Sequence, residues 1–174
     1  GTNPICICAP NEAGPPICLD MATSAVAFNY VMNARNENRT IPNDVAYDRE
    51  GEPTDNPHNV ASLRPMAEHK GYALAFMIDL LCGPLNGMPF GPNIPPMYDG
   101  LSEKRHLGSL VIALDPNRFF GGKYVSEEVA KMAESARRQP AKHKIKSVLV
   151  PGDDHYDNEA KRIIIGIPVE LGLA

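Results

Sequence analysis

Lys70 is the first residue whose type and position could do chemistry. It precedes an apolar run from Tyr72 to Cys82, so it falls at the start of the helix that this run predicts. A helix start is partly positive and disfavours a cation by a few tenths to about 1 kcal/mol, so a negative group is expected nearby. Phosphate or carboxylate beside Lys70 and Gly71 is one interpretation. In the other, the lysine extends into solvent and the glycine only turns the chain.

Arg105 and Asp20 are the other candidate binding residues. Arg105 precedes a continuous apolar run at 107–114, which predicts a strand buried on both faces. An arginine at the mouth of a sheet can hold a carboxylate through two hydrogen bonds, but its polar neighbours fit a surface arginine equally well. Asp20 directly follows the strand predicted at 17–19. Its carboxylate could accept hydrogen bonds from a ribose diol or cap the next helix.

The histidines and cysteines form no recognisable motif. The five histidines fall in loops or at element ends, and no neighbouring carboxylate marks one of them as a general base. The four cysteines have neither a C-x-x-C nor a Cys/His zinc spacing, and their apolar surroundings predict reduced core residues. They are Cys6, Cys8, Cys18 and Cys82. The sequence also lacks a P-loop, a nucleophile elbow and the glycine motif of a Rossmann domain.

Composition favours one globular region, and it excludes several classes of protein. The 174 residues are 43% hydrophobic and 22% charged, which is enough to bury a core. The net charge of -4 argues against a dedicated nucleic-acid binder. The sequence shows no signal or lipidation motif, so a cytoplasmic location is expected. Because the chain opens on Gly1 without an initiating Met, we expect it to be part of a longer polypeptide.

Several elements must position these residues. Strands are expected at 5–9 and 17–19, followed by a helix from a cap at Thr23 or Ser24 to about residue 35. The helix at 72–82 is apolar on every side, which predicts a helix enclosed by protein.

The remaining segments give weaker signals. Residues 40–65 are either a functional excursion or a segment with short strands of its own. Helices are expected at 125–138, with an imperfect capping box at Ser126, and at 158–163, and a strand is expected at 148–150.

Eight short motifs, in order over nearly the whole chain, resemble the type 2 malate/L-lactate dehydrogenase family. The motifs are Gly1-Thr2-Asn3-Pro4, Leu19-Asp20-Met21-Ala22-Thr23-Ser24, Ile41-Pro42, Asp48 with Gly51 and Pro53-Thr54, Lys70-Gly71-Tyr72, Pro89-Phe90-Gly91, Arg105 with Leu107-Gly108, and Val150-Pro151-Gly152. Residues 97–108 look closest to the ureidoglycolate dehydrogenases and their near relatives.

The resemblance implies an NAD(P)-dependent oxidoreductase acting on a small 2-hydroxy or 2-oxo acid of the malate, lactate or ureidoglycolate class. It also implies an α/β (α+β) fold in which a large mixed, mainly antiparallel sheet flanked by helices holds the cofactor without a Rossmann domain. Family members are dimers or larger, so a homodimer is expected.

The resemblance also assigns binding residues. The implied cofactor residues are Asp20, Met21, Ala22, Lys70, Gly152 and Asp153. Arg105 would hold the substrate carboxylate. NAD is favoured over NADP, which remains possible, because carboxylates near the adenosine would repel a 2'-phosphate. Those carboxylates belong to Asp153, Asp154 and Asp157.

One departure from the family limits the expected activity. The family's catalytic histidine lies upstream of the Gly-Thr-Asn-Pro motif, so no catalytic residue is expected in this chain. Residues 1–174 resemble the C-terminal half of a member, a single region made of a cofactor-binding domain and a C-terminal helical segment, inactive alone. The alternative is a noncatalytic fragment or subunit that binds an acid anion and pairs with another chain.

Overall fold

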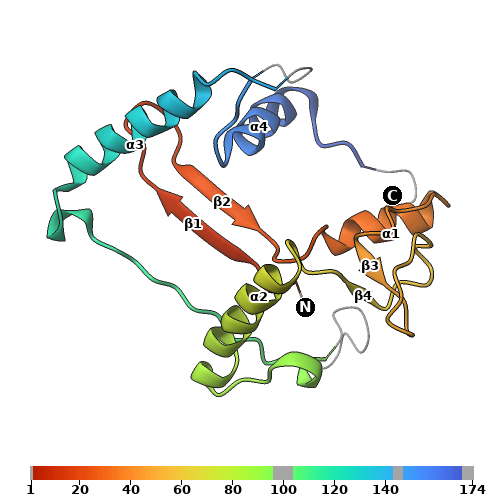
Figure 1. Cartoon of the computed structure of the whole chain (residues 1–174). Coiled ribbons are helices and arrows are strands. Elements are labelled where there is room, and N and C mark those ends of the chain that lie inside the picture. Colours follow the sequence, from red (N-terminus) through yellow and green to blue (C-terminus); the bar gives the residue numbers. More distant parts are fainter. Residues whose placement is uncertain (1, 96–103, 143–146, 170–174) are drawn as a thin grey trace. The chain divides into compact units, whose positions relative to one another are not determined.

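The computed structural model describes residues 2–95, 104–142 and 147–169. The chain divides into two compact units (Figure 1). The first consists of Gly1–Ile5 and Met21–Ile112, and the second of Cys6–Asp20 and Ala113–Ala174. Helices and strands are both present, so the mixed α and β class is confirmed. No helix in the described ranges has both the length and the apolar character needed to cross a bilayer.

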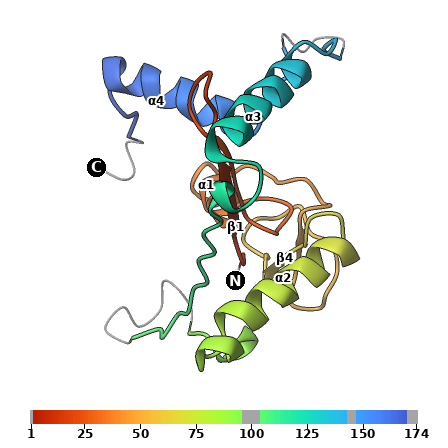
Figure 2. The ribbon, with the colours of Figure 1, turned by 90° about the vertical axis from the view of Figure 1, so that its left-hand side faces the viewer.

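The first unit contains two helices and a small sheet. Its elements are α1 (Phe28–Asn36), β3 (Ala46–Tyr47), β4 (Ser62–Leu63), α2 (His69–Cys82) and the short 3-10 helices η1 (Pro84–Asn86) and η2 (Gly91–Asn93). Figures 1 and 2 both show α2 as one unbroken helix. The segment at 40–65 therefore has short strands of its own, because β3 and β4 pair antiparallel with Ala46 opposite Leu63.

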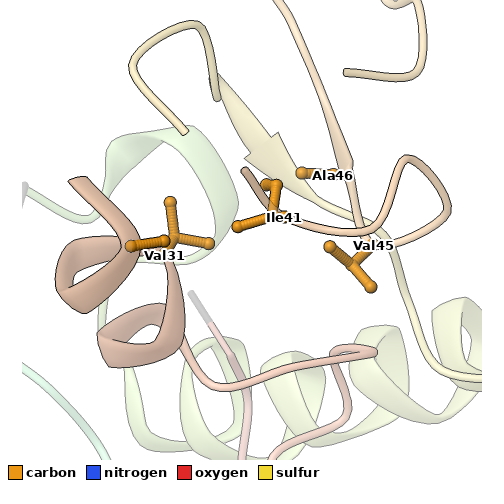
Figure 3. Close-up of a cluster of buried hydrophobic side chains, with 5 residues drawn as sticks. Val31, Ile41, Val45 and Ala46 are labelled. Carbon is orange, nitrogen blue, oxygen red and sulfur yellow. The ribbon is translucent and has the colours of Figure 1, made fainter. Parts of the chain in front are cut away.

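The buried core of this unit gathers around α1 and β3. Five side chains form it: Val31, Ala34, Ile41, Val45 and Ala46. The close-up in Figure 3 labels all of them except Ala34. Ile41, Val45 and Ala46 come from the polar segment at 40–65, and Val60 and Leu63 of the same segment pack against the cluster. The segment with the weakest signal in the sequence thus supplies three of the five core residues of the first unit.

The start of α1 differs from the prediction. Its N-cap is Ala27, which makes no side-chain cap hydrogen bond. The Thr23 hydroxyl instead donates to the Thr2 carbonyl at 2.9 Å, and the Ser24 hydroxyl donates to the Val26 carbonyl at 2.8 Å. The prediction of a cap at Thr23 or Ser24 is wrong, because these hydroxyls tie down the chain before the helix. The end of the helix near residue 35 is confirmed.

The helix α2 is not enclosed by the residues that the structure describes. Its only buried residue is Gly71. Tyr72 is 63% exposed and Phe76 is 57% exposed. The prediction of a core helix is wrong for this chain. An apolar sequence makes a helix suitable for burial, but burial also needs other segments that cover the helix.

The apolar run at 107–114 forms no strand in the structure, so that prediction is also wrong. Val111 is 86% exposed and Leu114 is 75% exposed. In the part of the chain that the structure describes, the sheets consist of the pairs β1–β2 and β3–β4, and neither reaches this run. A strand needs a neighbour for its backbone hydrogen bonds, which side-chain character does not provide.

The second unit combines a strand pair with two helices. Its elements are β1 (Ile5–Ala9), β2 (Ile17–Met21), the 3-10 helix η3 (Pro116–Arg118), α3 (Gly122–Arg137) and α4 (Asp153–Ile165). The first residue of β1 and the last residue of β2 belong to the first unit. The two strands confirm the predictions at 5–9 and 17–19, and Figure 1 draws them as antiparallel arrows.

The two helices of the second unit start earlier than expected. α3 begins after Gly121, and the Ser126 hydroxyl donates to the Lys123 carbonyl inside the helix at 3.0 Å, so the predicted capping box is wrong. α4 begins directly after Gly152, five residues before the predicted start at 158. The strand expected at 148–150 is not formed, although Val150 is buried.

Candidate active site

Lys70 lies in the first turn of α2, as expected. The helix has no side-chain cap and no acidic residue in its first turn. The residue at the cap, Glu68, has a positive φ of 53°, a conformation that non-glycine residues rarely adopt. The Lys70 side chain is exposed. The partly positive helix start therefore has a lysine beside it and no side-chain acceptor from the first turn.

The neighbouring glycine is required by the chain itself. A Cβ atom on Gly71 would lie 2.0 Å from the Met66 carbonyl oxygen, far inside contact distance. The space that the missing side chain of Gly71 leaves is thus filled by the Met66 backbone. The structure thus explains the glycine without a ligand, and a role of Lys70 in binding stays a prediction.

An open pocket of about 470 Å³ adjoins the start of α2. Its lining residues are Tyr47, Arg64, Pro65, Glu68, His69 and Tyr72. The Arg64 guanidinium lies 5.1 Å from the centre of the Tyr47 ring, and its Nη2 is 3.4 Å from Oε1 of Glu68. Sequence reasoning did not single out Arg64, which lies five residues before the start of α2. Arg64 is therefore a second cation near the start of α2, in addition to Lys70.

Arg105 is half-buried, and its Nε atom is shielded from solvent with no hydrogen-bond partner among the described residues. An unsatisfied buried donor costs about 1–3 kcal/mol, more if it is charged. Gly108 fixes the segment that carries Arg105, because a Cβ on Gly108 would lie 1.8 Å from the Cys82 carbonyl oxygen at the end of α2. From residue 70 to residue 82 the helix rises about 18 Å. The Arg105 segment is thus anchored at the end of α2 opposite Lys70, so the described residues do not bring the two cations together.

Asp20 is exposed in β2, one residue before the strand ends. It does not cap the next helix, because α1 begins at Phe28 with Ala27 as its N-cap. The capping alternative is therefore wrong, and hydrogen bonding to a ribose diol stays a prediction. Met21 and Ala22, the other residues of this motif, are half-buried.

Gly152 and Asp153 form the start of α4. Gly152 is buried with a φ of 101°, and a Cβ there would lie 3.3 Å from the Cys18 amide nitrogen. Cys18 N–H in turn donates to the Pro151 carbonyl at 3.0 Å. The glycine thus lets the turn before α4 pack directly on β2.

The Asp153 carboxylate already has partners within the chain. Arg137 donates to it through Nε at 3.1 Å and Nη2 at 2.7 Å, and the Val150 amide donates to it at 3.0 Å. These hydrogen bonds, Arg137 first, hold the pKa of Asp153 below its usual value. Asp153 therefore ties α3 to the turn before α4.

Stability should depend on this ion pair in acid. Because the pKa of Asp153 is lowered by folding, the stabilisation is present above the unfolded pKa of roughly 3.9 and is lost as pH falls below it. We expect Arg137→Gln to lower the free energy of unfolding by about 1 kcal/mol at neutral pH and to reduce the acid sensitivity of unfolding. Urea unfolding between neutral pH and the acid limit measures both effects. Arg138→Gln is the matched control, since Arg138, the C-cap of α3, is exposed and pairs with Glu134. An equal loss in both variants would contradict the assignment.

The cysteines do not all behave as core residues. Cys6 and Cys8 are exposed, so the prediction of buried thiols is wrong for them, while Cys18 and Cys82 are half-buried. The pKa of Cys18 is raised to about 12, chiefly by its hydrogen bond with the Cys8 thiol. That of Cys6 is also raised, again mainly through Cys8. The hairpin thus carries three neighbouring thiols that the sequence spacing did not reveal.

Histidines in the described ranges are exposed: His58, His69, His106 and His155. His155 Nε2 lies 4.0 Å from Oδ2 of Asp154, and both side chains are exposed. His143 and the family-like residues 97–101 lie outside the described residues.

Comparison with known proteins identifies the family of the chain. The sequence profile described as malate/L-lactate dehydrogenase matches residues 1–173. The chain belongs to the malate/L-lactate dehydrogenase family.

Individual relatives agree with this membership. Ureidoglycolate dehydrogenase (NAD(+)) of Escherichia coli K12 is 36% identical over 169 residues, which are 97% of this chain and 48% of that protein. Malate/(S)-sulfolactate dehydrogenase of Methanothermus fervidus is 36% identical over 175 residues, covering 99% and 50%. The structure of sulfolactate dehydrogenase from Methanocaldococcus jannaschii superposes with a TM-score of 0.86 at 27% identity, covering 99% of this chain and 49% of that one. The chain spans about half the length of the curated relatives it matches.

Proposed function

We propose that this chain is the cofactor- and substrate-binding part of an NAD(P)-dependent oxidoreductase that acts on a small 2-hydroxy or 2-oxo acid. The family match over residues 1–173 carries the proposal. Relatives named for ureidoglycolate and for malate and sulfolactate support a substrate with a carboxylate beside a hydroxyl group. Around these residues we expect the large, mainly antiparallel sheet of the family and a homodimer.

Arg105 is the substrate residue in this proposal. The buried Nε of Arg105 has no partner among the residues that the structure describes, and a substrate carboxylate could satisfy it, since a charged acceptor forms strong paired hydrogen bonds with arginine. The residue would orient the acid and stabilise its negative charge in the transition state.

Two groups of residues fit a nicotinamide cofactor. In the first unit, Lys70 would neutralise a phosphate beside the uncapped start of α2, and Met21 and Ala22 would line the nucleotide. In the second unit, the exposed Asp20 carboxylate is available to a ribose diol.

Gly152 and Asp153 would act differently from each other. Because the Asp153 oxygens are already occupied, Asp153 would hold the turn in which Gly152 offers its backbone to the far end of the cofactor. NAD is favoured, with NADP possible, because Asp154 and Asp157 are exposed at the start of α4 and would repel a 2'-phosphate nearby.

The bound nicotinamide supplies hydride transfer with the carbon that bears the hydroxyl group. Proton transfer needs a separate acid/base, for which we propose a histidine upstream of residue 1. No residue of this chain is proposed as catalytic.

The full-length protein tests the proposal. We expect reduction of NAD or NADP with at least one of four acids: malate, lactate, sulfolactate or ureidoglycolate. The absorbance of the reduced nicotinamide measures the reaction. The reverse reaction is tested with the corresponding 2-oxo acids. Absence of turnover with every pair, together with no saturable fluorescence change on adding NADH or NADPH, would refute the proposal.

Lys70→Met should weaken cofactor binding. Loss of one charge-assisted contact is worth about 1.5–3 kcal/mol, so the dissociation constant for the nicotinamide cofactor is expected to rise roughly 10- to 100-fold with little change in folding. Fluorescence titration with NADH measures it. Lys161→Met is the control, since Lys161 is an exposed residue of α4. An unchanged constant would remove Lys70 from the site.

A second candidate is a noncatalytic subunit that binds an acid anion and pairs with another chain. The exposed apolar residues of α2 favour it, because such a surface is suited to being covered. Native mass spectrometry of the isolated protein separates the two: a stoichiometric second polypeptide supports a paired subunit, and its absence supports one enzyme chain.

A further inference from the structure

Three cysteine thiols converge on one face of the β1–β2 hairpin in the second unit. Cys6 and Cys8 are two residues apart on β1, so their side chains point to the same face, and Cys18 comes from the paired strand β2. Their sulfur atoms all lie within 4.8 Å of one another. Neither strand alone shows this cluster, because the third thiol is ten residues away in sequence from its nearest neighbour.

The spacing of the sulfur atoms is close to that of a metal site. Two thiolates bound to one tetrahedral Zn²⁺ at about 2.3 Å lie about 3.8 Å apart. The Cys6–Cys8 and Cys6–Cys18 sulfur distances are 3.7 Å and 3.9 Å. The Cys8–Cys18 distance of 2.9 Å would have to open by about 0.9 Å, which a change in the side-chain torsions of the exposed Cys8 allows.

The chemistry of the donors selects the kind of cation. Thiolate sulfur is a soft ligand that favours Zn²⁺ and Cu⁺ over Mg²⁺ or Ca²⁺, which prefer oxygen. Three protein ligands leave one tetrahedral position open, and the exposure of Cys6 and Cys8 gives solvent access to it. Three thiolates around a dication leave a smaller residual charge than the same ligands around a monocation.

We propose that Cys6, Cys8 and Cys18 form a binding site for one Zn²⁺ ion, with water as the fourth ligand. On binding, the three thiols release their protons to solvent and form three Zn–S bonds, and no group is oxidised or reduced. The site goes beyond the dehydrogenase reaction and does not depend on it.

A metal here would act on the start of α4 as well as on the hairpin. The Cys18 amide donates to the Pro151 carbonyl at 3.0 Å, and buried Gly152 packs against the Cys18 backbone. An ion that joins β1 to β2 would therefore also hold the turn before α4. The expected structural effect is a stiffer second unit.

Metal titration of the full-length protein tests the site directly. The protein is reduced with a phosphine, stripped with a chelator, and titrated with Zn²⁺ against a chromophoric competitor. One tightly bound Zn²⁺ per chain is expected. Co²⁺ in place of Zn²⁺ should give a thiolate-to-cobalt charge-transfer band, which reports sulfur ligands independently of enzyme activity.

Substitutions identify the ligands. Cys6→Ser and Cys8→Ser should each weaken Zn²⁺ binding by more than the roughly 10- to 100-fold that loss of an outer-shell partner costs, and should abolish the cobalt band. Both residues are exposed, so folding is expected to persist, and far-ultraviolet circular dichroism checks it. Cys82→Ser is the matched control, since Cys82 belongs to α2 in the first unit and should bind metal like the unaltered protein.

Two results would overturn the proposal. The first is no zinc binding by the reduced protein, and the second is zinc binding that survives both substitutions. If the first is found together with an isolated protein that is lighter by two hydrogen atoms and has a Cys8–Cys18 disulfide, the pair is a redox couple instead.

Discussion

Replacement of Arg105 by lysine is expected to lower kcat/KM for the 2-hydroxy acid by about 10- to 100-fold in the full-length protein. Lysine keeps the positive charge but loses the paired geometry with a carboxylate, and hydrogen bonds to charged groups are worth about 1.5–3 kcal/mol. The buried Nε atom, which has no partner in the described part of the chain, is the donor that substrate is expected to satisfy.

Steady-state kinetics with the best acid found, at saturating cofactor, measures this effect. Arg118→Lys is the control, because the Arg118 side chain is 86% exposed and its ion pair is long, with 3.8 Å between Nε and Oδ2 of Asp115. A fall confined to the Arg105 variant, with NADH binding unchanged, supports a substrate role. Unaltered kinetics would exclude Arg105 from the substrate site while leaving family membership intact.

Alanine at position 71 is expected to lower the free energy of unfolding by about 3 kcal/mol, near the upper end for an overpacked site. The added Cβ would lie 2.0 Å from the Met66 carbonyl oxygen, so the backbone before α2 must move. The gain of up to about 1 kcal/mol that alanine brings to a helix is too small to offset this.

Urea or thermal unfolding of the full-length protein measures the loss. Gly14→Ala is the control, since the nearest atom to a Cβ there is the Asn11 amide nitrogen at 3.7 Å, an ordinary contact. Because Lys70 precedes the displaced residue, the Gly71 variant should also bind NADH more weakly. A Gly71 variant as stable as the control would show that the approach of Met66 is not required by the fold.

Sequence reasoning was most successful where signals were local. The hairpin strands follow from β-forming residues bounded by Pro4, Pro10 and Pro16, and the end of α2 follows from Gly83 and Pro84. The family followed from short motifs in order, and the profile match confirms it. The site residues themselves stay predictions, since their roles depend on ligands.

Sequence reasoning failed where a partner across the chain decides. The hydroxyl of Thr23 is a good cap in isolation, but it donates to the carbonyl of Thr2, 21 residues earlier in the chain. The polar segment at 40–65 supplies the core because β3 and β4 pair and bring Val45 and Ala46 against α1. Composition does not record such pairings.

The amino-acid sequence by itself determined the family, the strands of the hairpin and, in the described part of the chain, the presence of helices α1 to α4. The residues proposed to hold an acid and a cofactor stay predictions. Only the tertiary structure decided which apolar residues are buried, how the Asp153 carboxylate is occupied, and that three cysteines meet on one face. The physical reason is the distance along the chain over which each interaction acts. Propensity and turn chemistry act between near neighbours, whereas burial and side-chain clusters depend on which distant segments pack together.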